Sequence, residues 1–505
     1  MIWFIALLAA AIPLLIGASL SLTSSSGIQN YAVRDNFFWL NSGWRILHGQ
    51  IPHTDFSLAT GTLVSYLTAL GISIRGPFSG SIMFGQAVFA LVIAALTFIV
   101  LRRRTTPLLT VLGTLLCGLT IMATRQAGEP YYLHSYACYY NRVSEGLLIP
   151  FTLVTLMGRR GDRVAPSALE GIVAGALLVL IFFTKFTYGL VGIAIIAIAL
   201  LTKRLRVRDL FVILAGVALS GLILASLTGI SLVDWWADVG RPIRIGYSGS
   251  ITPRRIVGGI VKGLPSLFAL GIISGLAFNY LTRNERQRLA FAVIGFWGLS
   301  VLCTLASLQR QEYILPISIA LILTDALFRR GTRGSRRQRI ALTLLVLLLL
   351  PQLVPDARSL VLTWRTARAP ISGELQIKAA GLSDLRLGTN QVSFAAELND
   401  GLALAAESPT NAPLLAVDYS DVLAFALRRP PPEGGVVFWY PEFSFAPKDH
   451  PDFEMVFRGA PWLLIAREGR EQHLFWKIYG DQVKPKYQLR ASSQFFDLWS
   501  PVATP

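Results

Sequence analysis

Long apolar segments separated by short polar stretches constrain the fold of this 505-residue chain more than any other feature. A helix needs about 20 mostly apolar residues to cross the hydrocarbon core of a bilayer. Charged residues make up only 15% of the chain, against roughly 25% in soluble domains. The sequence therefore predicts an α-helical polytopic membrane protein with about eleven transmembrane helices, at residues 2–22, 81–101, 107–124, 145–157, 168–183, 188–202, 210–227, 256–281, 289–306, 313–328 and 340–354.

Basic residues stand in short runs between these segments, and the runs give an orientation. If the spans alternate, the runs at residues 102–104, 159–163, 203–208, 283–288 and 329–339 all lie on one side of the membrane. Lys and Arg are enriched in cytoplasmic loops. We therefore expect a cytoplasmic N-terminus and an extracytoplasmic C-terminus. The net charge of +17 then reflects topology, and we expect no nucleic-acid partner.

One further apolar stretch, residues 61–74, is too short to span a bilayer. Counting it as a span would also place the run at residues 102–104 on the opposite side from the other basic runs. We expect it to form an interfacial or re-entrant helix within a first loop, residues 23–80, that carries juxtamembrane helices. The first apolar segment lacks a preceding basic region, and we expect it to be retained as a helix rather than cleaved as a signal peptide.

The composition changes near residue 356 to that of a soluble domain. Short apolar runs alternate with Pro, Gly and Asp turns, which is typical of strands. We predict a transmembrane domain over residues 1–355 and a small mixed α/β extracytoplasmic domain over 356–505. Its expected strands are residues 414–417, 436–439, 462–466 and 495–499, and its expected helices are 373–380, 420–427 and 472–479.

Common catalytic and metal motifs give little guidance. The three cysteines have no CxxC spacing, and the five histidines form no HExxH pattern. The sequence also lacks a Walker A motif, which weighs against an ATP-driven pump.

Polar residues in the expected extracytoplasmic loops could carry chemistry instead. A carboxylate can act as general base on an acceptor hydroxyl or amine, and a cation can hold a phosphate leaving group. The candidate catalytic residues are Asp35, Asp55 and Glu145, and the candidate substrate-binding residues are Arg34, His53, Asn141, Arg142, Lys185, Arg310 and Tyr313.

Each candidate also has an ordinary structural explanation. Asp35 and Asp55 could cap helices, and Ser144-Glu145 could simply begin one. Lys185 could snorkel to the membrane surface, while Arg310 could pair with Glu312. His53 could be a structural hydrogen-bonding group.

Part of the first loop resembles a known family, the GT-C superfamily of integral-membrane glycosyltransferases, the class of the aminoarabinose and protein-mannosyl transferases. The similar phrase is Gly49-Gln50-Ile51-Pro52-His53-Thr54-Asp55-Phe56, followed by Thr60-Gly61-Thr62-Leu63 and Tyr66. A second phrase, Tyr313-Ile314-Leu315-Pro316, opens a late span. The resemblance implies that Asp35 is the catalytic base or a metal-binding carboxylate and that Glu145 is a second acid. It implies an inverting transfer from a polyprenyl-phosphate-linked sugar.

The resulting hypothesis is a glycosyltransferase of a bacterial inner membrane that acts on the extracytoplasmic side. Its partners would be the lipid-linked donor, membrane lipids and a glycan, lipid or protein acceptor. A divalent cation is the candidate cofactor, and its identity stays open. Two alternatives remain: a transporter or flippase of a lipid-linked saccharide, and a non-catalytic membrane scaffold with an extracytoplasmic interaction domain.

Overall fold

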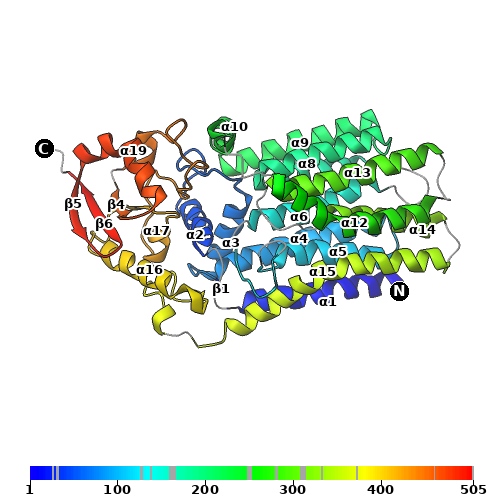
Figure 1. The fold of residues 1–505 in the computed structure, drawn as a ribbon, viewed down its shortest axis with the longest axis horizontal. Helices are drawn as coiled ribbons and strands as arrows, with labels where there is room; N and C mark the ends of the chain where they lie inside the picture. Colours follow the sequence, from blue (N-terminus) through cyan, green and yellow to red (C-terminus); the bar gives the residue numbers. More distant parts are fainter. Residues whose placement is uncertain are drawn as a thin grey trace.

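The computed structural model describes residues 1–24, 28–29, 33–125, 129–136, 139–157, 167–246, 253–278, 283–306, 314–330, 334–370, 373–459 and 461–502. Figure 1 shows a bundle of long, roughly parallel helices at one end and a smaller domain with a sheet at the other. Two short helices, α2 (Arg34–Leu47) and α3 (Leu63–Arg75), lie between them.

The bundle helices overlap every predicted apolar segment. Four of them, α1, α4, α9 and α15, are long and apolar enough to cross a membrane. The chain is therefore a mainly helical, multi-pass membrane protein, while the count of eleven spans and the orientation remain predictions. In the described residues the bundle contains α1 (Ile2–Thr23), α4 (Ser81–Leu101), α5 (Pro107–Met122), α6 (Tyr139–Leu156), α7 (Ala168–Thr184), α8 (Phe186–Leu201), α9 (Val207–Thr228), α12 (Pro253–Phe278), α13 (Arg283–Ala306), α14 (Ile314–Arg330) and α15 (Arg336–Thr366).

Helix α3 accounts for the short apolar stretch of the first loop. Its 13 residues are about 20 Å long at 1.5 Å per residue, which is less than the core of a bilayer. It packs closely on α4, because a Cβ on Gly71 would lie 1.9 Å from the Ser81 carbonyl oxygen and one on Gly85 would lie 1.8 Å from that of Leu67. Glycine at both positions allows the two backbones to touch.

Helix α15 runs further than the sequence predicts. It continues from Arg336 to Thr366 and contains both Pro351 and Pro355, so the predicted domain boundary at 355/356 falls inside a helix. Neighbouring helices can support a helix across a proline in a membrane protein. Asp356 binds Arg125 and Arg142 of the bundle, so this part of α15 is attached to the helices beside it.

The C-terminal domain contains a four-stranded sheet in the order β3-β4-β6-β5. Strands β3 (Leu414–Val417) and β4 (Trp462–Ala466) are parallel, with Leu415 opposite Leu463, and β6 (Phe496–Pro501) is antiparallel to both β4 and β5 (Tyr487–Ser492). A separate short parallel pair joins β1 (Ile28–Gln29) of the first loop to β2 (Arg386–Leu387). The remaining elements are η1 (Gly373–Leu375), η2 (Thr389–Gln391), α16 (Val392–Ala405), α17 (Leu423–Ala426), α18 (Phe453–Val456) and α19 (Arg470–Lys486).

The local predictions for this domain are partly right. The strands at 414–417 and 462–466 are confirmed, and the one at 495–499 is confirmed with a start one residue later and an end two residues later. The strand at 436–439 is wrong: the segment makes only single bridges, with Ser57 and Ser420. The helix at 373–380 is reduced to η1, that at 420–427 is shortened to α17, and that at 472–479 lies within the longer α19.

Helix α2 joins the two halves of the molecule. On one side, Ser42 donates a hydrogen bond to the Ser65 hydroxyl of α3 at 2.9 Å. On the other side, α2 binds the C-terminal domain: the Trp44 indole donates to the Arg429 carbonyl at 2.8 Å, and buried Arg45 donates to the carbonyls of Pro432 and Gly434. The first loop and the C-terminal domain therefore form one connected structure.

Candidate functional site

Asp35 lies in the first turn of α2, at the junction with the C-terminal domain. Its side chain is half-buried. Burial raises the pKa of the carboxyl to about 6, and a hydrogen bond with the Tyr419 side chain opposes part of that rise. A carboxylate whose pKa is close to neutrality is well suited to accept a proton as a general base. The catalytic role of Asp35 remains a prediction, which the raised pKa of its carboxyl favours.

A series of aromatic contacts leads from Asp35 towards the bundle. Trp39 follows Asp35 by one helical turn, so both side chains lie on the same face of α2. The ring of Trp39 contacts that of Tyr140 edge-on, with 5.8 Å between centroids. The Lys185 ammonium nitrogen lies 4.7 Å from the centre of the same Tyr140 ring. Trp39 and Tyr140 thus connect α2, the helix that carries Asp35, to Lys185.

Lys185 belongs to a group of four polar side chains that we call the α6–α8 cluster: Asn141, Glu145, Lys185 and Tyr188. The Lys185 ammonium donates to the Asn141 side-chain oxygen at 2.9 Å, and the Tyr188 hydroxyl donates to Glu145 at 2.9 Å. Asn141 and Glu145 are one turn apart on α6 and are both buried. The sequence-predicted residues Asn141, Glu145 and Lys185 therefore do come together.

Lys185 lies at a break between helices α7 and α8, where its side chain can reach the other members of the cluster. Helix α7 ends at Thr184 and α8 begins at Phe186, so Lys185 alone connects them in an extended conformation. The first loop lies directly against this break. A Cβ on Gly61 would lie 2.4 Å from the carbonyl oxygens of both Phe183 and Thr184, so only glycine permits this approach.

The cluster contains a hydrogen-bond donor that is not satisfied within the described residues. The Asn141 side-chain nitrogen is buried and has no hydrogen-bond partner among the described residues. Buried polar groups are nearly always hydrogen-bonded in native proteins. An acceptor such as a phosphate oxygen could receive hydrogen bonds from this nitrogen and from the Lys185 ammonium, which would satisfy the orphaned donor.

Asp55 lies in a different part of the first loop from Asp35. It accepts a hydrogen bond from the Ile51 backbone at 2.7 Å, which closes a turn, and it is 3.5 Å from Arg458 of the C-terminal domain. It borders a surface depression of about 380 Å³ together with His48, beyond the C-terminal end of α2. The 14 residues of α2, about 20 Å, separate this region from Asp35. The visible role of Asp55 is to shape the turn.

His53 is a buried member of the same turn, in a left-handed conformation with φ of 70°. Its Nδ1 atom lies 3.1 Å from the carboxylate of Asp238 in α10 (Leu232–Val239). His53 therefore contacts a protein carboxylate in the structure, and its contact with substrate remains a prediction.

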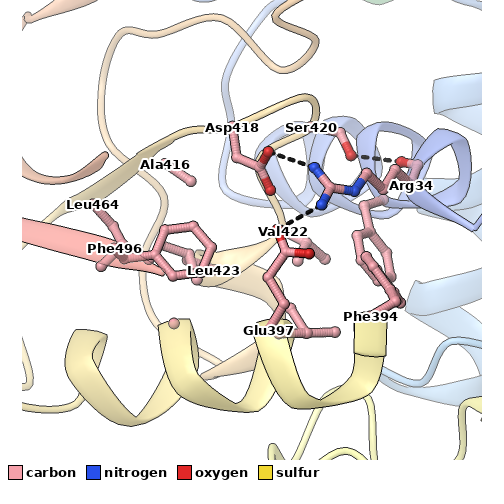
Figure 2. Close-up of a pocket in the computed structure, with 13 residues that line it drawn as sticks. Arg34, Phe394, Glu397, Ala416, Asp418, Ser420, Val422, Leu423, Leu464 and Phe496 are labelled. Carbon is pink, nitrogen blue, oxygen red and sulfur yellow. Dashed lines mark hydrogen bonds and ion pairs between the residues drawn. The ribbon is translucent and has the colours of Figure 1, made fainter. Parts of the chain in front are cut away.

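Both predicted substrate-binding arginines in the described residues have protein partners. Figure 2 shows the Arg34 guanidinium between Asp418, at 2.7 Å, and Glu397, at 2.5 Å, beside a cavity of about 30 Å³. Arg142 is buried and donates to the carbonyl of Arg125 and to Asp356. Contact of either arginine with substrate remains a prediction. Arg310 and Tyr313 lie outside the described residues.

The described residues do not provide a ready site for the candidate divalent cation. No three His, Cys, Asp or Glu side chains come together among them. Such ions need several oxygen or nitrogen ligands, and the described surroundings of Asp35 supply a tyrosine hydroxyl instead. We therefore derive no step through a metal.

Sequence reasoning missed two residues of the site. Tyr188 was expected only as the start of a span, and its contact with Glu145 depends on how α6 and α8 pack. Tyr419 comes from the C-terminal domain, 384 positions after Asp35, and carries no sequence signal. Tyr140 belongs to a tyrosine-rich segment, residues 131–140, that could equally form an aromatic belt.

Comparisons with known proteins give the following likenesses. No protein-family model matches the chain, and no curated protein matches it. The crystal structure of ArnT from Cupriavidus metallidurans bound to undecaprenyl phosphate is 14% identical over 98% of both chains, with a TM-score of 0.49. The apo ArnT structure is 12% identical over 97% of both chains, with a TM-score of 0.41. The arabinofuranosyltransferase AftD from Mycobacteria is 16% identical over 98% of this chain and 40% of its own, with a TM-score of 0.45.

These proteins are of the glycosyltransferase class that the first-loop phrase resembles. Because the identities are below 25% and the TM-scores below 0.5, the likenesses carry no argument about activity. The functional proposal rests on this chain's own residues.

Proposed function

We propose that this protein is a glycosyltransferase of a bacterial inner membrane that moves a sugar from a polyprenyl-phosphate-linked donor to an acceptor on the extracytoplasmic side. The observation that carries the proposal is the series of contacts from Trp39, one turn after Asp35 in α2, through Tyr140 to Lys185. This series of contacts supports a general base at Asp35 and a phosphate-binding cation at Lys185, near the junction of the bundle and the first loop.

In the proposed reaction, the Asp35 carboxylate accepts the proton of an acceptor hydroxyl or amine. The acceptor atom then bonds to the anomeric carbon as the bond between that carbon and the phosphate oxygen breaks. A single displacement of this kind inverts the anomeric configuration. Polyprenyl phosphate leaves with the electron pair of the broken bond.

The α6–α8 cluster would hold that leaving group. Charge-assisted hydrogen bonds are shorter and roughly twice as strong as neutral ones, so the Lys185 ammonium can stabilise the growing charge on the phosphate. The unpartnered Asn141 nitrogen would add a second donor. Glu145 and Tyr188 bind each other and would keep α6 and α8 in register beside Lys185. The partly exposed ring of Tyr140, which packs on buried Trp39, would offer an apolar surface for a sugar face.

The test is a deletion strain complemented with wild-type protein, Asp35→Asn, or the control Glu407→Gln, an exposed carboxylate of the C-terminal domain. Mass spectrometry of envelope glycans and of lipid-linked sugars reads out the result. We expect the deletion strain and the Asp35→Asn strain to lack one glycan modification and to accumulate its lipid-linked donor, while Glu407→Gln restores the modification. Restoration by Asp35→Asn would contradict the mechanism. A donor that accumulates only on the cytoplasmic side would favour a transporter.

A further inference from the structure

Three consecutive residues of the C-terminal domain bind the first turn of α2, the turn that contains Asp35. Asp418 pairs with the Arg34 guanidinium at 2.7 Å, and the Ser420 hydroxyl donates to the Arg34 carbonyl at 2.5 Å. Figure 2 shows both contacts. Between them in sequence, the Tyr419 side chain makes its hydrogen bond with the Asp35 carboxyl. We call the segment Asp418–Ser420 the clasp.

The backbone of the clasp is fixed by its neighbours in the C-terminal domain. It follows β3 directly, and all four residues of that strand are buried. The Trp439 backbone donates to the Tyr419 carbonyl at 2.9 Å, and the Trp439 indole donates to the carbonyl of Ala416 in β3 at 2.9 Å. The backbone of Tyr419 therefore has a defined position relative to the sheet.

The ring of Tyr419 is also held in place. It contacts the rings of Phe438 and Tyr440 edge-on, at centroid distances of 5.1 Å and 5.7 Å. Phe438 in turn contacts Phe38 of α2 at 5.0 Å. Edge-to-face pairs of this kind are favourable beyond the area they bury. These ring contacts hold the phenol in the orientation in which its hydroxyl bonds to Asp35.

We infer that the C-terminal domain completes the candidate active site, and that Tyr419 is a positioning residue whose hydroxyl orients the Asp35 carboxylate. A carboxylate has two oxygens, and a donor bound to one of them leaves the other to take the acceptor proton. This inference rests on the proposed function. It gives the C-terminal domain a part in the reaction rather than a separate binding role.

The charged groups around Tyr419 and Asp35 already have partners or lie further away, so we expect the Tyr419 hydroxyl to act directly on the pKa of Asp35. On the side of the C-terminal domain, Arg34 is engaged by Asp418 and Glu397, and Glu471 acts on Arg34 and Asp418. On the bundle side, Lys185 lies beyond Trp39 and Tyr140. A hydrogen bond to the charged form of a carboxyl lowers its pKa, so loss of the Tyr419 hydroxyl should raise the pKa of Asp35.

The experiment measures the initial rate of sugar transfer against pH for purified full-length protein, with envelope membranes of the deletion strain as the source of donor and acceptor. In Tyr419→Phe we expect a rate about tenfold lower at neutral pH, the size of a lost hydrogen bond to a charged group, and an acid limb shifted to higher pH. The matched control is Tyr479→Phe, which removes a buried hydroxyl bonded to the Pro451 carbonyl in the same domain. That variant should lose stability without moving the acid limb.

A second variant covers the case in which Tyr419→Phe does not fold. Incorporation of 3-fluorotyrosine at position 419 keeps the ring and the hydroxyl but makes the phenol a stronger donor, and should shift the acid limb to lower pH. If the acid limb stays at its wild-type position in both variants while Asp35→Asn is inactive, the inference about Tyr419 is wrong and the proposed function stands. Full activity of Asp35→Asn would overturn both.

Discussion

The imidazole Nδ1 atom of His53 lies 3.1 Å from the carboxylate of Asp238, across 185 positions of sequence. The same carboxylate accepts hydrogen bonds from the Leu58 backbone and from Arg241 at 2.8 Å and 2.7 Å. Arg241, in α11 (Arg241–Ile245), also binds Asp449 of the C-terminal domain at 3.2 Å. One buried carboxylate therefore connects the first loop to α10 and, through Arg241, to the C-terminal domain.

Replacing this carboxylate should destabilise the protein strongly. Burial alone would raise the pKa of Asp238, but the contacts with His53, Arg241 and Leu58 lower it overall. Asp238→Asn removes the charged partner of the turn and leaves Arg241 with Asp449 alone, and we expect a loss of about 3 kcal/mol, the lower end of the roughly 3–5 kcal/mol seen when one member of a buried ion pair is removed. Thermal unfolding in detergent measures the change.

The control for that measurement is Asp234→Asn in the same helix, whose side chain accepts a hydrogen bond from the Thr54 hydroxyl at 3.1 Å. Equal shifts in unfolding temperature for Asp238→Asn and Asp234→Asn would contradict this account.

The stability that Asp238 contributes should also depend on pH. Because the folded-state pKa of Asp238 is lowered, its stabilising contribution is present above the ordinary aspartate pKa of about 3.9 and is lost as the pH falls below it.

The close approach of the first loop to the break between α7 and α8 can be tested by adding a methyl group at position 61. Gly61→Ala would place a Cβ 2.4 Å from two carbonyl oxygens, so the loop must move away from the break. We expect lower thermal stability and a sugar-transfer rate reduced at least tenfold, a modest loss compared with the hundredfold that small misplacements can cause. Gly221→Ala in α9, where a Cβ would meet nothing within 4 Å, should leave both unchanged. A Gly61→Ala variant with wild-type stability and rate would show that the loop does not need this contact.

Lys185 should determine the affinity for the lipid phosphate. The proposal gives its ammonium a charge-assisted bond to the leaving group, and such bonds contribute about 1.5–3 kcal/mol. We expect Lys185→Met to bind undecaprenyl phosphate in nanodiscs at least tenfold more weakly than wild type. The control is Lys378→Met, at an exposed position of the C-terminal domain, because it also removes one positive charge. If both variants bind equally well, the α6–α8 cluster does not hold the phosphate.

Hydropathy was enough to predict the bundle, because each span must supply its own apolar surface. The end of α15 could not be predicted in the same way. Two prolines at 351 and 355 suggest a helix end, yet Asp356 continues the helix and binds Arg125 at 2.7 Å. That stabilising contact joins residues 231 positions apart. The strand expected at 436–439 failed for a related reason, since Trp439 is buried and uses its indole to bind Ala416.

The site was only partly predictable. Asp35, Asn141, Glu145 and Lys185 could be selected because they are polar residues beside apolar segments. The family resemblance favoured Asp35 over Asp55 as the base, but the sequence could not show the turn of Asp55, which depends on a local backbone bond to Ile51. Nor could it show that Arg34 is engaged by Asp418. Tyr419 reaches Asp35 only because the C-terminal domain packs on α2, which is a tertiary contact without a sequence motif.

The most direct test of the account is the rate of sugar transfer by purified Asp35→Asn, with envelope membranes of the deletion strain as substrate. Asparagine has nearly the same shape as aspartate but cannot accept the acceptor proton, and general bases typically contribute about 10²–10⁴-fold to a rate. We predict a loss of that size with undecaprenyl phosphate binding and thermal stability close to those of wild type. A rate within twofold of wild type would contradict the assignment of Asp35 as the base.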